Sequence, residues 1–250
     1  MRQLYGVASL AELVRTHAPC VVLTGAGVST ESGIPDFRSP TGVWRRYDPM
    51  EYASIDAFRA EPAKVWDFYG RRLASLAGAE PNDGHRALAE LERRGWVEAV
   101  ITQNVDGLHA RAGSRNLVEV HGSIRTASCG TCGATVTSEE ALGLLPVPSC
   151  PDCGEALKPD VVMFGELLPE AAIGCAIRLS SQAALMLVVG SSLEVFPVAG
   201  LPLETLAAGG RLAIVNRGET PLDDRADVVI DASAGRTLAA LARALPERRE

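Results

Sequence analysis

The 250-residue sequence lacks the features that mark several classes of protein. No apolar run is long enough to cross a membrane, and the first residues, Met1–Leu4, do not resemble the start of a signal peptide. The sequence has no internal repeat and no low-complexity segment. These absences predict an intracellular, cytoplasmic protein without a membrane partner.

Positive charge is also scarce. The net charge is −7 and the pI is about 5.2, which argues against a protein that binds the nucleic-acid backbone and suits a partner that carries lysines. Lys64 and Lys158 are the only lysines. Hydrophobic residues make up 47% and charged residues 22%, so the chain can bury one sizeable core with a small inserted module.

Strand and helix patterns alternate along most of the chain. Short apolar runs predict strands at 21–24, 97–102, 117–121, 161–163, 185–189, 212–215 and 228–230. Apolar residues at helical spacing predict helices at 7–17, 54–60 and 62–77, and another that is capped near Asn82 and ends near Arg94. We expect 39–53 to be a mobile loop. The alternation predicts an α/β fold with a doubly wound parallel sheet.

A glycine-rich segment, 25–38, follows the first of these strands. Gly25 and Gly27 let the backbone turn tightly and approach a ligand, and amides at the start of a following helix can bind a pyrophosphate. The third glycine of the dinucleotide fingerprint is absent, since Thr30 stands there, so a plain strand–turn–helix is an alternative. Asp36, Phe37 and Arg38 on the same loop favour a binding site.

Four of the six cysteines form two Cys-x-x-Cys pairs, which predict a structural zinc site. Seventeen residues separate the pairs, a spacing typical of zinc ribbons. Four thiolates leave no open position, so the metal should hold the module together and take no part in chemistry. The ligands are Cys129, Cys132, Cys150 and Cys153. Cys20 and Cys175 have apolar surroundings and are expected in the core.

Polar residues follow several predicted strands. The carboxyl ends of strands in an open α/β sheet face the ligand crevice, so Gln103, Asn104, Asp106 and His121 are candidate site residues. His121 is a candidate general base, because an imidazole titrates near neutral pH. Asn104 and Asp106 can alternatively cap a helix. Gly190–Leu193 and Asn216 follow two later strands.

Together these motifs resemble those of the sirtuins, NAD-dependent protein-lysine deacylases. The matches are Gly-Ala-Gly-Val-Ser at 25–29, Gly-Ile-Pro-Asp-Phe-Arg at 33–38, Thr-Gln-Asn-Val-Asp at 102–106, His-Gly at 121–122, the four cysteines, Val-Val-Met-Phe-Gly-Glu at 161–166, Gly-Ser-Ser-Leu at 190–193 and Asn216. The resemblance implies a Rossmann-like NAD-binding domain (1–38, 84–123 and 159–250), a helical insertion (39–83) and a zinc-binding module (124–158).

The resemblance also implies a role for each matching residue. The cofactor NAD would be held by Gly25, Ala26, Gly27, Ser29, Ile34, Asp36, Phe37, Arg38, Gln103, Asn104, Val105, Asp106, Gly190, Ser191, Ser192, Asn216, Arg217, Gly218 and Ala234. The acyl-lysine protein would be held by Ala53, Tyr69, Arg72, Val162, Phe164, Gly165, Glu166, Leu193 and Val195. His121 and Asn104 would be catalytic, with one structural Zn²⁺ per chain; we expect a monomer.

The reaction that this family implies is acyl transfer to ADP-ribose. The amide oxygen of acyl-lysine attacks the ribose carbon as nicotinamide leaves, and His121 then deprotonates a ribose hydroxyl, which attacks the resulting imidate. Hydrolysis releases lysine and O-acyl-ADP-ribose.

One pair of residues predicts which acyl groups are removed. Tyr69 and Arg72 lie three residues apart on the apolar side of the helix predicted at 62–77, where an arginine is costly unless it meets an anion. Tyr69-x-x-Arg72, with the small Ala53 upstream, resembles sirtuins that remove succinyl and malonyl groups. A side chain that reaches the solvent, or a carboxylate elsewhere in the fold, is the alternative. Arg71 should pair with Asp67.

Other classes of protein remain as alternatives. A nicotinamide oxidoreductase would use the same sheet but would favour glycine at position 30. A zinc-ribbon binding module would leave Asn104, Asp106 and His121 unexplained. A deacetylase without desuccinylase activity, or an ADP-ribosyltransferase, would use the same site.

Overall fold

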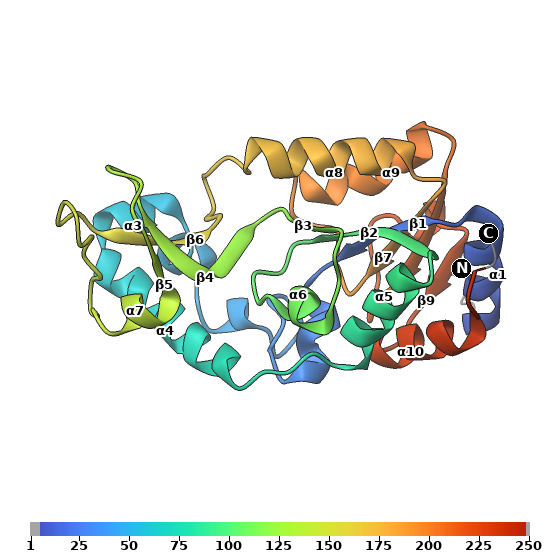
Figure 1. Cartoon of the computed structure of the whole chain (residues 1–250), viewed down its shortest axis with the longest axis horizontal. Coiled ribbons are helices and arrows are strands. Elements are labelled where there is room, and N and C mark those ends of the chain that lie inside the picture. The colour runs from blue at the N-terminus through green and yellow to red at the C-terminus, as the bar shows by residue number, and fades with distance from the viewer. Residues whose placement is uncertain (1–5, 249–250) are drawn as a thin grey trace.

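A computed structural model describes residues 6–248, which form a six-stranded parallel sheet and a smaller group of elements beside it (Figure 1). The order of the large sheet is β3-β2-β1-β7-β8-β9. Its strands are β1 (Cys20–Thr24), β2 (Val97–Thr102), β3 (Leu117–Glu119), β7 (Leu185–Val189), β8 (Arg211–Val215) and β9 (Val228–Ile230). Every residue of the adjacent central strands β1 and β7 is buried, as expected for apolar strands covered on both faces.

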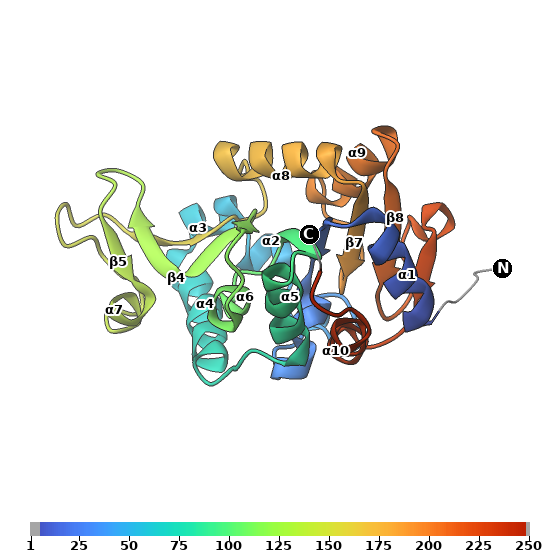
Figure 2. The same cartoon turned by 45° about the vertical axis from the view of Figure 1, so that its right-hand side comes forward.

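Helices cover both faces of this sheet (Figures 1 and 2). One face carries α1 (Val7–His17), α5 (Asp83–Arg93) and α10 (Ala234–Ala244), and the other carries α8 (Glu170–Gln182) and α9 (Leu201–Ala207). Successive strand residues point to opposite faces, so Val22 packs in the first core with Leu88, and Leu23 packs in the second with Leu201. The predicted doubly wound α/β fold is confirmed.

The strand order places a crevice between β1 and β7. The chain runs from β1 to β2 and β3 in one direction and then crosses to β7 on the other side of β1. In a doubly wound sheet, ligands bind at the carboxyl ends of the strands where the order reverses in this way.

The smaller group contains a three-stranded antiparallel sheet of order β5-β4-β6. It consists of β4 (Gly122–Cys129), β5 (Thr135–Thr137) and β6 (Leu157–Val161), with the short helix α7 (Ser138–Leu142). This sheet lies at the far end of the molecule from α1 and α10 (Figure 1).

The predicted strand at 161–163 is wrong in both its bounds and its sheet. Only Val161 is in a strand, and that strand, β6, pairs antiparallel with β4 instead of joining the parallel sheet. Its buried and half-buried residues alternate, which is the pattern of a strand with one covered face. The apolar residues Val162 and Met163 follow β6 outside any strand, and their apolar character led to the wrong prediction of a core strand.

Helices of the segment 39–83 pack against the small sheet. They are the 3₁₀-helix η2 (Val43–Arg45), α2 (Pro49–Tyr52), α3 (Ile55–Ala60) and α4 (Pro62–Ala77). Trp66 of α4 is fully buried among residues of the small sheet, and its indole N–H donates to Leu157 O at 2.8 Å. The predicted helices at 54–60 and 62–77 are confirmed, and the expected loop at 39–53 contains η2 and α2.

The remaining helices are short. They are η1 (Ala26–Ser32), α6 (Leu108–Ala112), η3 (Val198–Gly200) and η4 (Asp223–Arg225). None of the helices between residues 6 and 248 has both the length and the apolar character needed to cross a bilayer. Met1–Leu4, from which no signal peptide was expected, lie outside the described residues.

Candidate active site

A cavity of about 1540 Å³ lies at the carboxyl ends of the parallel strands and extends to α4. Most residues that the sequence predicted for a site line it. From the loops of the large sheet these are Gly25, Ala26, Gly27, Ser29, Ile34, Asp36, Phe37, Arg38, Gln103, Asn104, Val105, Asp106, His121, Gly190, Ser191, Ser192, Val195, Asn216, Arg217 and Ala234. From α4 and its neighbours they are Ala53, Tyr69, Arg72, Val162, Phe164, Gly165 and Glu166. Leu193 and Gly218 are not among its lining residues.

Gly25 and Gly27 in the first loop lie too close to the backbone of the second loop to carry a side chain. A Cβ atom on Gly25 or Gly27 would lie 2.7 Å from the backbone of Gly190, which is closer than real side chains approach. Gly27 N–H donates to Gly190 O at 2.8 Å, so the two strand-end loops are bonded to each other. The segment Ala26–Ser32 is a 3₁₀-helix. The backbone amide of Gly27 is therefore already bonded to the second loop.

His121 is held in one tautomer. It lies two residues after the end of β3 and directly before β4, and its Nδ1 lies 3.1 Å from Gln103 O. Because a carbonyl oxygen only accepts, Nδ1 carries the proton and Nε2 of the neutral ring carries a lone pair. Burial lowers the pKa of His121, opposed by the hydrogen bond to Gln103. The imidazole is therefore a neutral base at pH 7, at the wall of the cavity.

Gln103 joins the two strand ends on which the cavity is built. Its backbone N–H donates to Thr24 O at 3.0 Å, and its side-chain Nε2 donates to Ser191 Oγ at 2.9 Å. Ser191 Oγ also accepts from Leu193 N–H at 3.3 Å. Leu193 has a φ of 54°, a strained conformation for a branched residue that surrounding bonds must maintain.

Ser29, Asn104 and Asp106 form one hydrogen-bonded group. Ser29 Oγ donates to Asp106 Oδ2 at 2.7 Å and accepts from Asn104 Nδ2 at 3.1 Å. His85 Nε2 lies 3.3 Å from Ser29 Oγ, and its Nδ1 accepts from Asn82 N–H. The ring of His85 therefore donates from Nε2 to Ser29. Asp106 Oδ1 also accepts from Leu108 N–H at the start of α6, although the N-cap residue of that helix is Gly107 and not Asp106.

Arg72 lies among aromatic rings at the α4 end of the cavity. Its guanidinium carbon is 4.7 Å from the ring centre of Phe37 and 5.9 Å from that of Phe68. Within residues 6–248, no carboxylate pairs with it in an ion pair. Burial lowers the pKa of Arg72, opposed by the nearby Tyr69 and Asp106, and burial raises that of Tyr69, opposed by the charge of Arg72. A charged, partly desolvated guanidinium and a neutral phenol are thus available to an anion.

The neighbouring arginine behaves differently. Arg71 is exposed and pairs with Asp67 at 3.0 Å, as predicted. Ala53 is buried beside the cavity, and its carbonyl accepts from Phe164 N–H at 2.9 Å.

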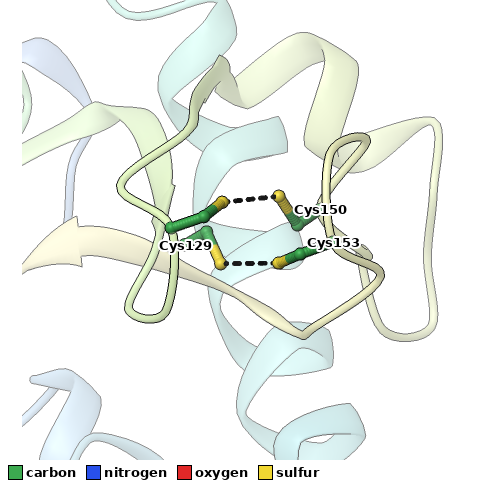
Figure 3. A group of neighbouring side chains, drawn as sticks. Cys129, Cys150 and Cys153 are labelled. Atoms are coloured by element: carbon green, nitrogen blue, oxygen red, sulfur yellow. Dashed lines mark hydrogen bonds between the residues drawn. The ribbon is translucent and has the colours of Figure 1, made fainter.

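The four cysteines of the two pairs lie in two similar turns that face each other (Figure 3). Their Sγ atoms all lie within 4.8 Å of one another, with 3.5 Å between Cys129 and Cys153 and between Cys132 and Cys150. A tetrahedral zinc with Zn–S bonds of about 2.3 Å needs sulfurs roughly 3.8 Å apart. The residues present therefore fit a structural zinc ion.

Comparisons with known proteins agree with this geometry. The model of the Sir2 family matches residues 25–197. The chain is 48% identical over 225 residues to an NAD-dependent protein deacetylase of Sulfolobus acidocaldarius, and the match covers 88% of each. The chain belongs to the Sir2 family.

Two further Sir2 proteins cover nearly all of the chain. It is 46% identical over 223 residues to NAD-dependent protein deacylase 1 of Archaeoglobus fulgidus, covering 89% of this chain and 91% of the relative. A solved complex of Sir2 with a p53 peptide and NAD⁺ has a TM-score of 0.88 at 41% identity, covering 96% of this chain and 98% of that one. The sirtuin resemblance is confirmed.

Two residues of this Sir2 site were missed by the sequence analysis. Trp44 lines the cavity and stacks on Phe37 and Phe68, with ring centres 5.0 Å and 6.0 Å away. Glu194 also lines it and pairs with Arg38 at 2.8 Å across the crevice. The three aromatic residues of the segment 39–53, Trp44, Tyr47 and Tyr52, were an available signal for an aromatic wall of the site. The Glu194 pair joins residues far apart in the chain, which no local pattern reveals.

Proposed function

We propose that this Sir2-family protein is an NAD-dependent protein-lysine deacylase. The observation that carries the proposal is the neutral His121, whose Nε2 lone pair is free to accept a proton beside the cavity formed by the β1 and β7 loops. NAD would supply an ADP-ribose acceptor for the acyl group and nicotinamide as the leaving group. The names of the relatives and the NAD⁺ complex of Sir2 support this assignment.

NAD would lie along the cavity from β8 toward α4. Asn216, Arg217 and Ala234 would hold the adenosine end, and Ala26 with Ser192 the diphosphate. At the other end, Ile34 and Phe37 would cover the nicotinamide, and Asn104 and Asp106 would orient it. The hydrogen bonds of Ser29 to both Asn104 and Asp106 keep these two side chains in place.

His121 would remove the proton from a ribose hydroxyl. Its Nδ1–H bond to Gln103 O fixes the ring so that Nε2 is the basic atom. When the ring becomes cationic, the same carbonyl stabilises the charge. Gln103 thus orients the base through its backbone while its side chain ties the loop to Ser191.

The acyl-lysine peptide would enter between 165–166 and 193–195 and pair with them as a strand. Glu166 N–H already donates to Met163 O, so Glu166 would offer its carbonyl to the peptide. Val162 and Phe164 would line the tunnel for the acylated side chain.

The acyl group would include succinyl and malonyl as well as acetyl. Arg72 lines the cavity with aromatic neighbours, and no ion pair to a carboxylate holds it in the part of the chain that the structure describes. Bidentate pairing with an acyl carboxylate would compensate its lost hydration. Tyr69 would add a hydroxyl donor, and Ala53 leaves space.

The substitution Arg72→Met tests the acyl preference. We expect desuccinylation to fall by about 10–100-fold, because a charge-assisted hydrogen bond contributes roughly 1.5–3 kcal/mol. Deacetylation should change little, since the acetyl group has no charge for the guanidinium. The measurement is kcat/KM for succinyl- and acetyl-lysine versions of one peptide.

Arg71→Met is the matched control, because Arg71 is adjacent but exposed and paired with Asp67. It should leave both activities unchanged. An equal loss on both peptides in Arg72→Met, or a wild-type protein that does not desuccinylate, would disprove the acidic acyl preference.

Mass spectrometry of products tests the function itself. The protein, NAD and an acetyl-lysine peptide should yield nicotinamide, the free lysine peptide and O-acetyl-ADP-ribose. Formation of NADH would instead identify an oxidoreductase, and an ADP-ribosylated peptide would identify a transferase. We also propose a cytoplasmic location, where zinc-binding cysteines remain reduced.

A further inference from the structure

A buried series of hydrogen-bonded side chains, which begins at His109, lies behind the cavity wall. His109 belongs to α6 and has 1% of its surface exposed, and Thr24 and Thr102 end the neighbouring strands β1 and β2 at 0% and 2%. Thr24 Oγ1 lies 2.8 Å from Thr102 Oγ1 and 3.0 Å from His109 Nε2. Thr102 Oγ1 accepts from Asn104 N–H at 3.1 Å. The hydrogen-bonded series therefore runs from His109 through the hydroxyls of Thr24 and Thr102 to the backbone of Asn104.

The direction of each bond follows from the groups. Thr24 donates its single hydroxyl proton to Thr102, so it accepts at the imidazole, and His109 must be the donor through Nε2–H. Burial, with neighbouring His85, lowers the pKa of His109 to about 3. The ring is therefore neutral at pH 7, and it presents one fixed donor to Thr24.

A second set of bonds reaches the other end of Asn104. Its side-chain Nδ2 donates to Ser29 Oγ, which also accepts from His85. The rings of His85 and His109 meet edge to face with centres 4.8 Å apart. One histidine thus supports the side chain of Asn104 and the other supports its backbone.

We propose that His109 is a positioning residue for the reaction, acting through Thr24 and Thr102 to fix the place of Asn104 in the nicotinamide end of the cavity. This rests on the proposed deacylase function. Donors in a reaction site must be held within a fraction of an ångström, and a shift of about 1 Å can cost roughly a hundredfold in rate. A buried histidine that only filled the core would affect stability and not turnover.

Two substitutions break this hydrogen-bonded series at different points. His109→Leu removes the donor, and Thr24→Val removes the hydroxyl with little change in shape. We expect each to lower kcat for nicotinamide release, with NAD and an acetyl-lysine peptide, by about 10–100-fold. Since both break one series, the double variant should be no slower than the slower single variant. ADP-ribose affinity should stay within about twofold, because Asn104 would act only at the nicotinamide end.

Conservative replacements distinguish positioning from packing. His109→Gln keeps an N–H donor near the place of Nε2 and should restore kcat to within about threefold, as should Thr24→Ser. Thr205→Val is the matched control. Thr205 is fully buried and donates to Ser180 O at 2.7 Å, between α9 and α8, so its loss should lower the melting temperature without lowering kcat.

The outcomes separate this proposal from the proposed function. Wild-type protein that releases no nicotinamide would overturn both. Active wild type with His109→Leu and Thr24→Val at full kcat would overturn the positioning role alone, as would a Thr205→Val variant with the same loss of kcat. If His109→Leu fails to fold, Thr24→Val decides the question by the same criterion.

Discussion

His121→Ala is expected to lower the rate of deacylation by about 10²–10⁴-fold, the usual cost of losing a general base. The imidazole is the group at the cavity wall whose tautomer, set by the bond from Nδ1–H to Gln103 O, leaves a basic nitrogen unprotonated. Alanine cannot accept the ribose proton, so the chemical step should be impaired while the NAD site stays intact. Steady-state kinetics and NAD affinity measured together test this.

The pH profile gives a second check on the same residue. Burial lowers the pKa of His121 from its ordinary value near 6.5. The active form is the neutral ring, so activity should be complete at pH 7 and fall only as the pH drops through a pKa below 6.5. An acidic limb centred above 6.5 would contradict this environment.

His17→Ala is the control for His121→Ala. His17 ends α1 just before the amino end of β1, at the opposite end of that strand from the cavity. Its Nδ1 lies 3.1 Å from Leu13 O, and its loss should leave kcat unchanged. A His121→Ala variant with near wild-type turnover would remove His121 from the mechanism.

The sequence was most informative where a residue's environment is local. Asn82 was predicted as a helix cap, and its side-chain oxygen accepts from Gly84 N–H and His85 N–H. The central strands were predicted because Val21–Leu23 and Leu185–Val189 are apolar throughout and buried on both faces. The sirtuin motifs also placed most site residues around one cavity.

Contacts between distant segments could not be predicted from the sequence. Gly190 meets Gly27 across two loops, so the role of these glycines in loop packing requires coordinates. The hydrogen bonds from His109 to Asn104 join α6 to β1 and β2. In the sequence, His109 is a single histidine in a polar segment, and no pattern indicates these bonds. The strand β6 was misplaced because its partner β4 lies on the other side of the cysteine turns.

The zinc site is expected to decide whether the smaller group of elements folds. Structural zinc contributes about 10–16 kcal/mol in small zinc-binding peptides at pH 7, comparable with the whole stability of a typical domain, about 5–15 kcal/mol. Cys129 and Cys150 are buried in the same core as Trp66 and Leu157, so releasing the metal exposes that core. α4, which carries Tyr69 and Arg72, packs on it through Trp66.

Cys150→Ser should therefore lose zinc, lower the melting temperature strongly and shift the fluorescence of Trp66 as its indole leaves Leu157 O. A strong chelator should do the same to the wild type before any direct effect on chemistry, because four thiolates leave no open position for substrate. Elemental analysis of protein purified under reducing conditions should give one zinc per chain. Cys175→Ser is the matched control, since Cys175 lies in α8 outside the cluster, and it should keep both zinc and stability. Wild-type protein without zinc, or Cys150→Ser with unchanged zinc and melting temperature, would show that the cysteines serve another purpose.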